Sequence, residues 1–507
     1  MSGPVVLDGN HLTLSDVVSV ARQGRPVEIS AEARARMEKA RAAVLHIVSD
    51  GRPVYGVNTG FGRLSDRIVP KEQLPELQRN LVRSHASGVG PDLPRELVRA
   101  MMLLRANSLA KGVSGVRVEV VETLLAALHH DLVPAIPEQG SVGASGDLAP
   151  LAHLALALMG EGEVIDERGH RMPSSGALAK AKVPPITLVE KEGISLVNGT
   201  CLMASQLSFL VHDGEALLRI SELAAAVSFD ALKGNVGALD PRLHEARNLP
   251  AQSSVAAEMR TLLSGSSLTR APGDYQGQDP YVLRCIPQVL GAVRLGLSWA
   301  RSVAEGELNA ASDNPLVFDG EFLSGGNFHG QPLALALDTV GLALSYLGSF
   351  SERRTARLVD ADLSRGLSPF LSASPGFSSG YMIPPYVAAS LVAEDQVLVH
   401  PASAASLPTS ANQEDFNSMG ATAGRKGLRL LENLRRILAI ELMVGVQALE
   451  QRGPSRGGKG SETVRAAVRT RIPPLTEDRP PAPDIERLYE ALREGSFLAD
   501  VERSLGA

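Results

Sequence analysis

The pattern of hydrophobic and polar positions predicts a mixed first part of the chain and a second part dominated by helices. Beyond residue 191, apolar positions recur with helical spacing over long stretches. The predicted helices cover residues 200–230, 251–263, 288–309, 331–359, 385–399 and 426–450. Their apolar faces are wide and rich in alanine and glycine, which favours close helix packing. The pattern therefore predicts a bundle of long helices, followed by a tail with two shorter ones.

The first 190 residues contain shorter elements. One or two short strands and a short helix precede a helix that Ser30 can cap and that ends near Gly51. Further helices are predicted from about residue 75 to 85, over 94–109 and over 116–129. Residues 163–185 lose helical periodicity and are predicted to form a surface loop or hairpin. We therefore expect a mainly α-helical protein with an N-terminal domain of residues 1–190 and a bundle of residues 191–507.

Composition narrows the class of protein. The chain has 507 residues, of which 44 % are hydrophobic and 21 % charged, as in an ordinary soluble globular protein. A formal charge of −6 gives no reason to expect nucleic acid or an anionic membrane as a partner. The longest apolar stretches are short or interrupted by Asp338, so no membrane span is expected. Without a visible export signal, we expect a cytoplasmic protein.

The two cysteines, Cys201 and Cys285, exclude a disulfide-rich scaffold and lack the paired spacing of a metal site. A single bridge between them remains open, but two reduced thiols fit a cytosolic protein better. We expect no metal ion.

A segment of glycine and small residues at positions 140–150 separates the helical patterns. In Ala144-Ser145-Gly146, the Gly146 nitrogen can approach the Ala144 carbonyl carbon with little steric penalty. Attack there with loss of two waters would close an imidazolone ring and turn Ser145 into an exocyclic methylidene, which is a strong electrophile. A lone Ala-Ser-Gly tripeptide is more often an ordinary turn, so this chemistry needs support from other residues.

Polar residues in other loops provide that support. Three glycines surround Tyr55 within residues 54–62, which indicates a mobile loop that carries a phenolic hydroxyl rather than a packing residue. Loops at 195–200, 278–285, 325–330 and 410–415 also hold polar groups that a buried bundle should not contain without a reason. Each has a structural alternative, such as a helix cap, a surface arginine, a glycine turn or a charged helix start. Their joint occurrence favours a single site.

These motifs together resemble the aromatic amino acid ammonia-lyase family. The resemblance runs in order from Tyr-Gly-Val-Asn-Thr-Gly-Phe-Gly at 55–62, through Gly-Ser-Val-Gly-Ala-Ser-Gly-Asp-Leu-Ala-Pro at 140–150, to Asn-Gln-Glu-Asp at 412–415. It implies a 4-methylideneimidazole-5-one group (MIO) formed from Ala144, Ser145 and Gly146. It also implies a fumarase/aspartase-like helical lyase and a homotetramer whose active sites combine residues of more than one chain.

The resemblance also assigns roles to side chains. It makes Tyr55 the base that removes the β-proton of the substrate. A tyrosine ordinarily has a pKa of about 10, so we expect a site that favours phenolate. Arg284 would hold the substrate carboxylate by a bidentate contact. By the same resemblance, Asn198, Gln278 and Tyr281 would hold the imidazolone oxygen or the amino acid. Phe328 would press the precursor loop into the bend that cyclises.

Substrate choice is implied by fewer residues. The pair Ser84-His85 is of the type found in family members that act on histidine, and an imidazole suits His85 as a hydrogen-bond partner. By default, a histidine at such a helix end would simply favour the helix dipole. The Glu414 carboxylate can accept from an imidazole N–H, whereas a benzene ring would leave it unpaired at a cost of roughly 1–3 kcal/mol. Histidine-type members usually have His where this chain has Phe416, and an acidic residue is commoner where it has Gln331.

The expected function is elimination of ammonia from L-histidine to give trans-urocanate, with the methylidene capturing the substrate amine rather than the ring. The alternatives are a tyrosine or phenylalanine ammonia-lyase, a 2,3-aminomutase with the same electrophile, and an inactive helical scaffold. A pyridoxal-phosphate lyase is a further alternative, but the chain lacks the alternating βα pattern common in those enzymes. The expected partner is a small-molecule substrate, an amino acid, and neither nucleic acid nor a membrane is expected.

Overall fold

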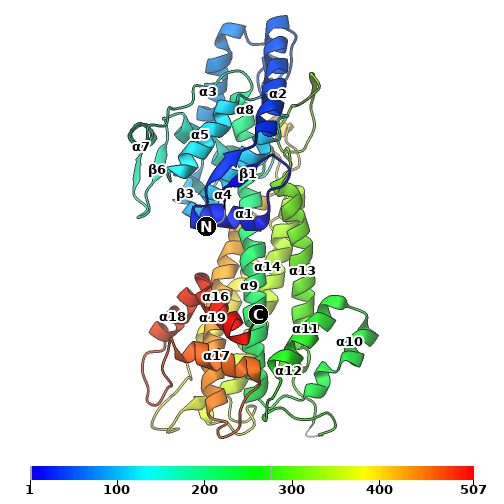
Figure 1. Cartoon of the computed structure of the whole chain (residues 1–507), viewed down its shortest axis with the longest axis vertical. Helices are drawn as coiled ribbons and strands as arrows, with labels where there is room; N and C mark the ends of the chain where they lie inside the picture. Colours follow the sequence, from blue (N-terminus) through cyan, green and yellow to red (C-terminus); the bar gives the residue numbers. More distant parts are fainter. Residues whose placement is uncertain (1–2, 275–276, 507) are drawn as a thin grey trace. The chain divides into compact units, whose positions relative to one another are not determined.

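The computed structural model describes residues 3–274 and 277–506, and the described residues are mainly helical (Figure 1). The chain forms two compact units, each assembled from three stretches. The first unit comprises Met1–Phe209, Ala300–Asp338 and Pro401–Arg425, and the second comprises Leu210–Trp299, Thr339–His400 and Lys426–Ala507. The predicted division at residue 190 follows chain order, whereas these units are interleaved along the chain.

The first unit contains short helices and all of the strands that the described residues form. Its elements are β1 (Val5–Leu7), α1 (Leu14–Gln23), β2 (Val27–Ile29), α2 (Ala31–Asp50), α3 (Leu74–His85), β3 (Val89–Asp92), α4 (Arg95–Ala110), α5 (Val118–His129), β4 (Val133–Pro134), β5 (Pro137–Gln139), α6 (Leu148–Leu158), β6 (Glu163–Ile165), β7 (Arg171–Pro173), α7 (Ser174–Ala181), α8 (Glu192–Val197), β8 (Leu316–Phe318) and β9 (Glu321–Leu323). The pair β1–β2 is parallel, whereas β3–β5, β4–β6–β7 and β8–β9 are antiparallel.

Local sequence signals explain several boundaries in this unit. The Ser30 side chain accepts a hydrogen bond from the Ala33 N–H at the start of α2, and Gly51 ends the helix with a φ of 72°. Thr13 and Asp16 form a capping box at the start of α1. The predicted hairpin in residues 163–185 is present as β6 and β7, but helix α7 follows it and was not predicted.

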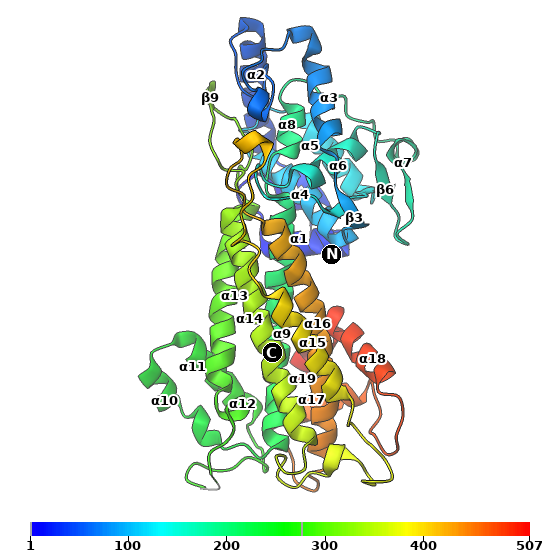
Figure 2. The same cartoon turned by 180° about the vertical axis from the view of Figure 1, so that it is seen from behind.

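Four long helices contribute residues to both units: α9 (Cys201–Ala231), α13 (Ile286–Leu308), α14 (Gln331–Val359) and α16 (Gly420–Glu450). In the second unit they run side by side, as the two opposite views show (Figures 1 and 2). The second unit also contains α10 (Pro241–Arg247), α11 (Pro250–Leu262), α12 (Tyr281–Arg284), α15 (Pro384–Leu398), α17 (Lys459–Arg469), α18 (Ala482–Arg493) and α19 (Ser496–Leu505). The tail therefore has three helices where two were predicted.

The 3₁₀ turns join these elements. They are η1 (Gly62–Leu64), η2 (Lys71–Gln73), η3 (Val236–Leu239), η4 (Pro369–Leu371) and η5 (Ser410–Asn412).

Small residues allow the long helices of the second unit to pack closely, as predicted. A Cβ atom on Gly427 of α16 would lie 2.7 Å from a methyl carbon of Leu210 on α9, and one on Gly445 would lie 3.2 Å from Val227. A fully buried ion pair between Arg354 of α14 and Glu441 of α16 joins the same bundle, and Ser228 of α9 donates to Glu441 at 2.7 Å. Close backbone approach and this buried polar network tie three helices together.

Helix α14 corrects the expectation that no apolar stretch reaches membrane-spanning length. It has 29 residues, and its most apolar 18-residue window has a mean hydropathy of 1.5. Of that window, 56 % is buried inside the structure, and a core helix of a soluble protein satisfies the same criterion. Length and composition alone are therefore weak support for a membrane span.

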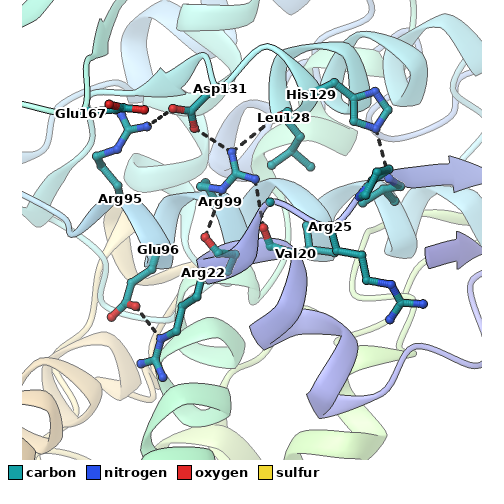
Figure 3. A pocket seen from close by; sticks show the side chains of 14 residues that line it. Val20, Arg22, Arg25, Arg95, Glu96, Arg99, Leu128, His129, Asp131 and Glu167 are labelled. Carbon is teal, nitrogen blue, oxygen red and sulfur yellow. Dashed lines mark hydrogen bonds and ion pairs between the residues drawn. The ribbon is translucent and has the colours of Figure 1, made fainter. Parts of the chain in front are cut away.

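In the first unit, Arg99 of α4 joins the ends of two neighbouring helices (Figure 3). This buried guanidinium donates to the carbonyl oxygens of Val20 and Ala21 at 2.9 and 3.1 Å, and to that of Leu128 at 3.2 Å. It also donates to the Asp131 carboxylate at 2.8 Å. The last carbonyls of a helix lack partners within it, so Arg99 satisfies groups that would otherwise be buried without hydrogen bonds. These residues line a cavity of about 770 Å³.

Candidate functional site

A cavity of about 660 Å³ in the first unit brings together six of the predicted site residues and Ala144. The six come from separate stretches of the chain: Tyr55, His85, Ser145, Asn198, Phe328 and Glu414. Apolar side chains of α3, α6 and α8 line the same cavity, including Leu81, Leu148 and Ile194. An apolar cavity with a few convergent polar groups is the usual form of a small-molecule site.

Only glycine fits at the third position of the central tripeptide. Gly146 has a φ of +77°, and a Cβ atom there would lie 2.1 Å from the carbonyl oxygen of Gly199. That oxygen accepts a hydrogen bond from the Asp147 N–H at 2.6 Å. The backbone of the tripeptide therefore packs directly against the Asn198–Gly199 backbone, which leaves no room for a side chain.

Two donors reach the carbonyl oxygen of Ser145. The Gly199 N–H donates to it at 3.3 Å. The Asn198 side-chain amide, in the orientation that satisfies both its nitrogen and its oxygen, donates to it at 2.9 Å and accepts from the Asn314 N–H at 3.1 Å. This carbonyl oxygen would become the ring oxygen of an imidazolone, so the arrangement fits the group that the sequence predicts.

Asp147 fastens the end of the loop to helix α9. Its fully buried carboxylate accepts from the N–H groups of Leu202 and Met203 at 2.8 and 3.1 Å, in the first turn of α9, and from the Ser141 hydroxyl at 2.8 Å. Burial raises the pKa of Asp147 to about 7, although these hydrogen bonds lower it. The sequence motif contains this residue, but its role as a helix cap was not predicted.

The Glu414 side chain contacts both Ser145 and Thr409. The Ser145 hydroxyl donates to one carboxylate oxygen of Glu414 at 3.3 Å, and the Thr409 hydroxyl donates to the other at 2.9 Å. The backbones of Thr409 and Glu414 also pair with each other at 2.9 and 3.3 Å. Two hydrogen bonds thus hold the carboxylate toward the cavity.

The surroundings of Tyr55 within this chain do not favour phenolate, contrary to the expectation. Burial raises the pKa of Tyr55, and the carboxylates of Glu414 and Asp313 raise it further. Among the residues that the structure describes, one contact lowers this pKa, a hydrogen bond of 3.4 Å from the Gly62 N–H to the phenolic oxygen. An effective base at this position needs a nearby positive group, and the described residues around Tyr55 do not supply one.

His85 and Phe328 also border the cavity, and both are half-buried. His85 is the last residue of α3, and its Nδ1 lies 3.0 Å from the Ser84 hydroxyl. Phe328 is followed by His329, whose Nε2 lies 2.9 Å from the carbonyl oxygen of Phe416 and whose ring stacks on the Phe416 ring at 6.1 Å. Phe416, which departs from the histidine-type motif, therefore borders the same cavity.

The other three predicted residues belong to the second unit. Gln278 and Arg284 are hydrogen-bonded to each other and line a different cavity, of about 330 Å³. The Arg284 guanidinium lies 4.8 Å from the centre of the Tyr281 ring, and Tyr281 is 68 % exposed. The structure thus brings Gln278, Tyr281 and Arg284 together, but not into the cavity of Tyr55 and Ser145.

Several buried polar residues behind the cavity were not assigned a role from the sequence. Lys191 forms a fully buried ion pair with Asp313 at 2.7 Å, and Ser195 donates to the same carboxylate at 2.7 Å. Arg105 donates to the carbonyl oxygen of Asn198 at 2.7 Å. The available signal was a charged residue within an apolar helical run, as in Met-Met-Leu-Leu-Arg at 101–105.

Within residues 3–274 and 277–506, no group of three or more His, Cys, Asp or Glu side chains is placed to hold a metal ion. Cys201 and Cys285 are free thiols.

Comparisons with known proteins agree with the motifs. The model of the family described as aromatic amino acid lyase matches residues 12–470. The chain is 49 % identical to a histidine ammonia-lyase of Symbiobacterium thermophilum, over 98 % of both chains, and 48 % identical to one of Geobacillus thermodenitrificans, over 97 % of both.

Solved structures agree as well. A tyrosine aminomutase from Streptomyces globisporus is similar with a TM-score of 0.95 and 39 % identity, over 99 % of both chains. A histidine ammonia-lyase from Trypanosoma cruzi is similar with a TM-score of 0.92 and 41 % identity, over 99 % of this chain and 95 % of that one. The resemblance drawn from the motifs and the helical lyase fold are confirmed. The chain belongs to the aromatic amino acid lyase family and is a carbon–nitrogen lyase.

Proposed function

We propose that the protein is an ammonia-lyase that converts L-histidine to trans-urocanate and ammonia. One observation carries the choice of substrate: the carboxylate of Glu414 faces a cavity that also contains His85 and the reactive Ser145. The Thr409 hydroxyl donates to one oxygen of this half-buried carboxylate, and the other loses its donor when the Ser145 hydroxyl leaves. An imidazole N–H can then donate to that oxygen, whereas a benzene ring cannot. The names of the relatives that are 47–49 % identical over nearly the whole chain support the same substrate.

The electrophile in this proposal is MIO, formed from Ala144, Ser145 and Gly146. The close packing of Gly146 on Gly199 and the two donors on the Ser145 carbonyl oxygen fit such a ring. When present, the group supplies an electron-poor alkene that captures the substrate amine and improves it as a leaving group. The chain's own part is to hold that ring: Asn198 and Gly199 bind its oxygen, and Asp147 anchors the loop.

Tyr55 is proposed as the base that takes the β-proton. Its phenolic oxygen accepts from the Gly62 N–H and lies in the same cavity as Ser145. Because burial and nearby carboxylates raise the pKa of Tyr55, an additional cation is needed to make it an effective base. Arg284, which also suits the substrate carboxylate, is the proposed source.

We propose that Gln278, Tyr281 and Arg284 reach the cavity from a second copy of the chain, in a homotetramer with shared active sites. Within one chain Gln278 and Arg284 line a separate cavity, and Tyr281 lies beside Arg284, which supports this arrangement. Exposed apolar side chains on α13, α14 and α15, such as Leu295, Leu342 and Tyr386, provide surface for an oligomer. We further propose a cytoplasmic location and a small-molecule amino acid substrate, with no nucleic acid or membrane as a partner.

A second candidate is a tyrosine or phenylalanine enzyme of the same family, either a lyase or a 2,3-aminomutase. It is favoured by Phe416, which places an aromatic ring at the cavity where histidine-type members usually have a histidine. The structural likeness to a tyrosine aminomutase is consistent with it.

A panel of substrates tests the proposal. Purified protein is incubated separately with L-histidine, L-tyrosine and L-phenylalanine, and the conjugated product is followed by absorbance. Turnover of histidine alone is the expected result, whereas a preference for tyrosine or phenylalanine would overturn the choice of substrate. A β-amino acid product would identify a mutase. Intact-protein mass spectrometry of the same sample is expected to show a chain lighter by two waters, and an unmodified mass would favour an inactive scaffold.

A further inference from the structure

Arg105 is a buried cation without a buried counter-charge. Its side chain on α4 is 0 % exposed. One guanidinium nitrogen, Nη1, donates to the Asn198 carbonyl oxygen at 2.7 Å, and Nη2 donates to the Ser108 hydroxyl at 3.1 Å. Among the described residues, Nε has no hydrogen-bond partner and no carboxylate pairs with the guanidinium. Burial of an unpaired charge is costly, so its position here needs a reason.

Other buried cations of this unit show a different pattern. Lys191 is fully buried, but its ammonium is paired with the Asp313 carboxylate at 2.7 Å. Arg99, about 1.7 turns before Arg105 on α4 by helical spacing, is paired with Asp131 and satisfies the ends of two helices. Arg105 instead directs its positive charge to a single peptide group beside the reactive loop.

That peptide group is the one between Asn198 and Gly199. Its carbonyl accepts from Arg105, and its N–H donates to the Ser145 carbonyl oxygen at 3.3 Å. The C=O and N–H of a trans peptide point in opposite directions, so Arg105 and Ser145 lie at the two ends of one dipole. Hydrogen bonds in such a chain polarise one another. A Cβ atom on Gly199 would lie 2.4 Å from Nη1, so glycine is required for this contact.

The Ser145 carbonyl is where charge develops if the tripeptide cyclises. The first water takes the Ala144 carbonyl oxygen together with the amide hydrogens of Ser145 and Gly146, as the Gly146 nitrogen bonds to the Ala144 carbonyl carbon. The second takes the Ser145 hydroxyl and the Ser145 α-hydrogen. As the Cα–H bond breaks, its electron pair forms the new double bond while the Cβ–O bond breaks. Negative charge builds on the adjacent carbonyl oxygen, where preorganised donors stabilise it.

We propose that Arg105 is a positioning residue for the loss of the two waters. It fixes and polarises the Asn198–Gly199 peptide, so that the Gly199 N–H stabilises the charge on the Ser145 carbonyl oxygen. This inference rests on the proposed function, because only an enzyme that uses the MIO electrophile needs the cyclisation. It concerns the maturation of the chain rather than the turnover of substrate.

The test measures maturation directly. Wild type, Arg105→Met, Arg105→Lys and the control Arg99→Met are made by cell-free synthesis, and intact-protein mass spectra are recorded at intervals. We expect Arg105→Met to lose water on the order of 10²-fold more slowly than wild type, as when one donor of an oxyanion site is removed. Arg105→Lys keeps a cation near Asn198 and is expected to recover much of the rate. Arg99→Met is expected to melt at a lower temperature but to lose both waters at the wild-type rate.

Two results would overturn the inference. One is a folded Arg105→Met chain that matures as fast as wild type, and the other is an Arg105→Lys chain as slow as Arg105→Met. If Arg105→Met does not fold by circular dichroism, Arg105→Gln replaces it, because the amide keeps a polar side chain at this position but removes the positive charge. A wild-type rate in a folded Arg105→Gln chain would then contradict the inference. A wild-type chain that keeps both waters would overturn the proposed function, and this inference with it.

Discussion

The hydroxyl of Ser145 donates to the carboxylate of Glu414 at 3.3 Å, although 269 residues separate the two in the chain. The contact places the residue proposed to become the electrophile beside the residue proposed to select the substrate ring. Both belong to the first unit, as do the other residues that line their cavity. The residue proposed to become the electrophile and the residue proposed to select the ring therefore lie in the same unit.

Ser145→Ala is expected to fold normally and to lose nearly all activity. Alanine has no hydroxyl to lose, so no electrophilic alkene can form, and removal of a group that acts in covalent catalysis costs on the order of 10³-fold or more in kcat. The measurement is histidine turnover together with intact mass and circular dichroism. Retained turnover in a folded Ser145→Ala chain would refute the role of the serine.

Tyr55→Phe is expected to lower kcat on the order of 10²- to 10⁴-fold while the chain still becomes lighter by two waters. The phenolic oxygen is lost, but the tripeptide and its supports are unchanged. In wild type, kcat/KM should rise toward alkaline pH, because the base acts when deprotonated and burial raises the pKa of Tyr55. That rise should be absent from Tyr55→Phe. A wild-type pH profile in the variant would show that another group is the base.

Glu414→Gln tests the choice of substrate. The amide keeps the size of the side chain but removes the charged acceptor for an imidazole N–H, which is worth about 1–3 kcal/mol, or about 5- to 150-fold in kcat/KM for histidine. The value for phenylalanine, measured in the same assay, should change less, so the ratio of the two shifts. An equal loss of kcat/KM for both amino acids would mean that Glu414 does not distinguish the imidazole ring from the benzene ring.

Co-expression of two inactive variants tests whether sites are shared between chains. Tyr55→Phe and Arg284→Ala alter different cavities of one chain. If each active site takes Tyr55 from one copy and Arg284 from another, mixed oligomers contain some intact sites, and activity should reappear. The matched control combines Tyr55→Phe with Ser145→Ala, which are both inactive and alter the same cavity, and it should stay inactive. Absence of recovery in the first mixture would place each site within a single chain.

Asp395 gives a prediction for stability that does not involve the site. This buried carboxylate on α15 accepts from Asn433 at 2.8 Å, and burial raises its pKa to about 7. A raised pKa in the folded state means that wild type is stabilised by the bound proton at low pH and loses this stability as pH rises from about 4 to about 7. The Asp395→Asn side chain cannot ionise, so this variant should keep its stability as pH rises.

Above about pH 7 the free energy of unfolding of Asp395→Asn is expected to exceed that of wild type by roughly 1–2 kcal/mol, after allowance for solvent screening. At about pH 4 the two proteins should be equally stable. Urea unfolding of both proteins across this pH range measures it. Wild type as stable as the variant at neutral pH would contradict the prediction.

Helix boundaries could be predicted where local signals are strong. Helix α14 (Gln331–Val359) has the predicted bounds because a glycine-rich segment precedes a continuous apolar pattern. Helix α16 begins at Gly420 rather than at residue 426, because its first turn is rich in glycine and reads as a loop. Tertiary packing decides there: a Cβ atom on Gly424 would lie 2.1 Å from the Gln206 side chain, so the small residues serve close contact.

Site residues could be predicted only where a motif carries them. Tyr55, Ser145 and Glu414 belong to recognisable motifs and share one cavity. Arg105 belongs to no such motif, and its partner Asn198 lies 93 residues away along the chain. The raised pKa of Tyr55 likewise comes from its burial and, in addition, from Glu414, and sequence spacing predicts neither. Long-range contacts of single polar residues leave no periodic signal.

The hydrogen bonds between Asp147 and the first turn of α9 allow molecules that have folded to be distinguished from molecules that have not. The Leu202 and Met203 N–H groups hold the Asp147 carboxylate at the end of the loop, so we expect the loop to keep its bend only once α9 has formed and docked. A ring closed in that state stays closed when the chain is later denatured. A denatured chain that had once folded would then still be lighter by two waters. Its mass would distinguish it from a newly made chain that has never folded.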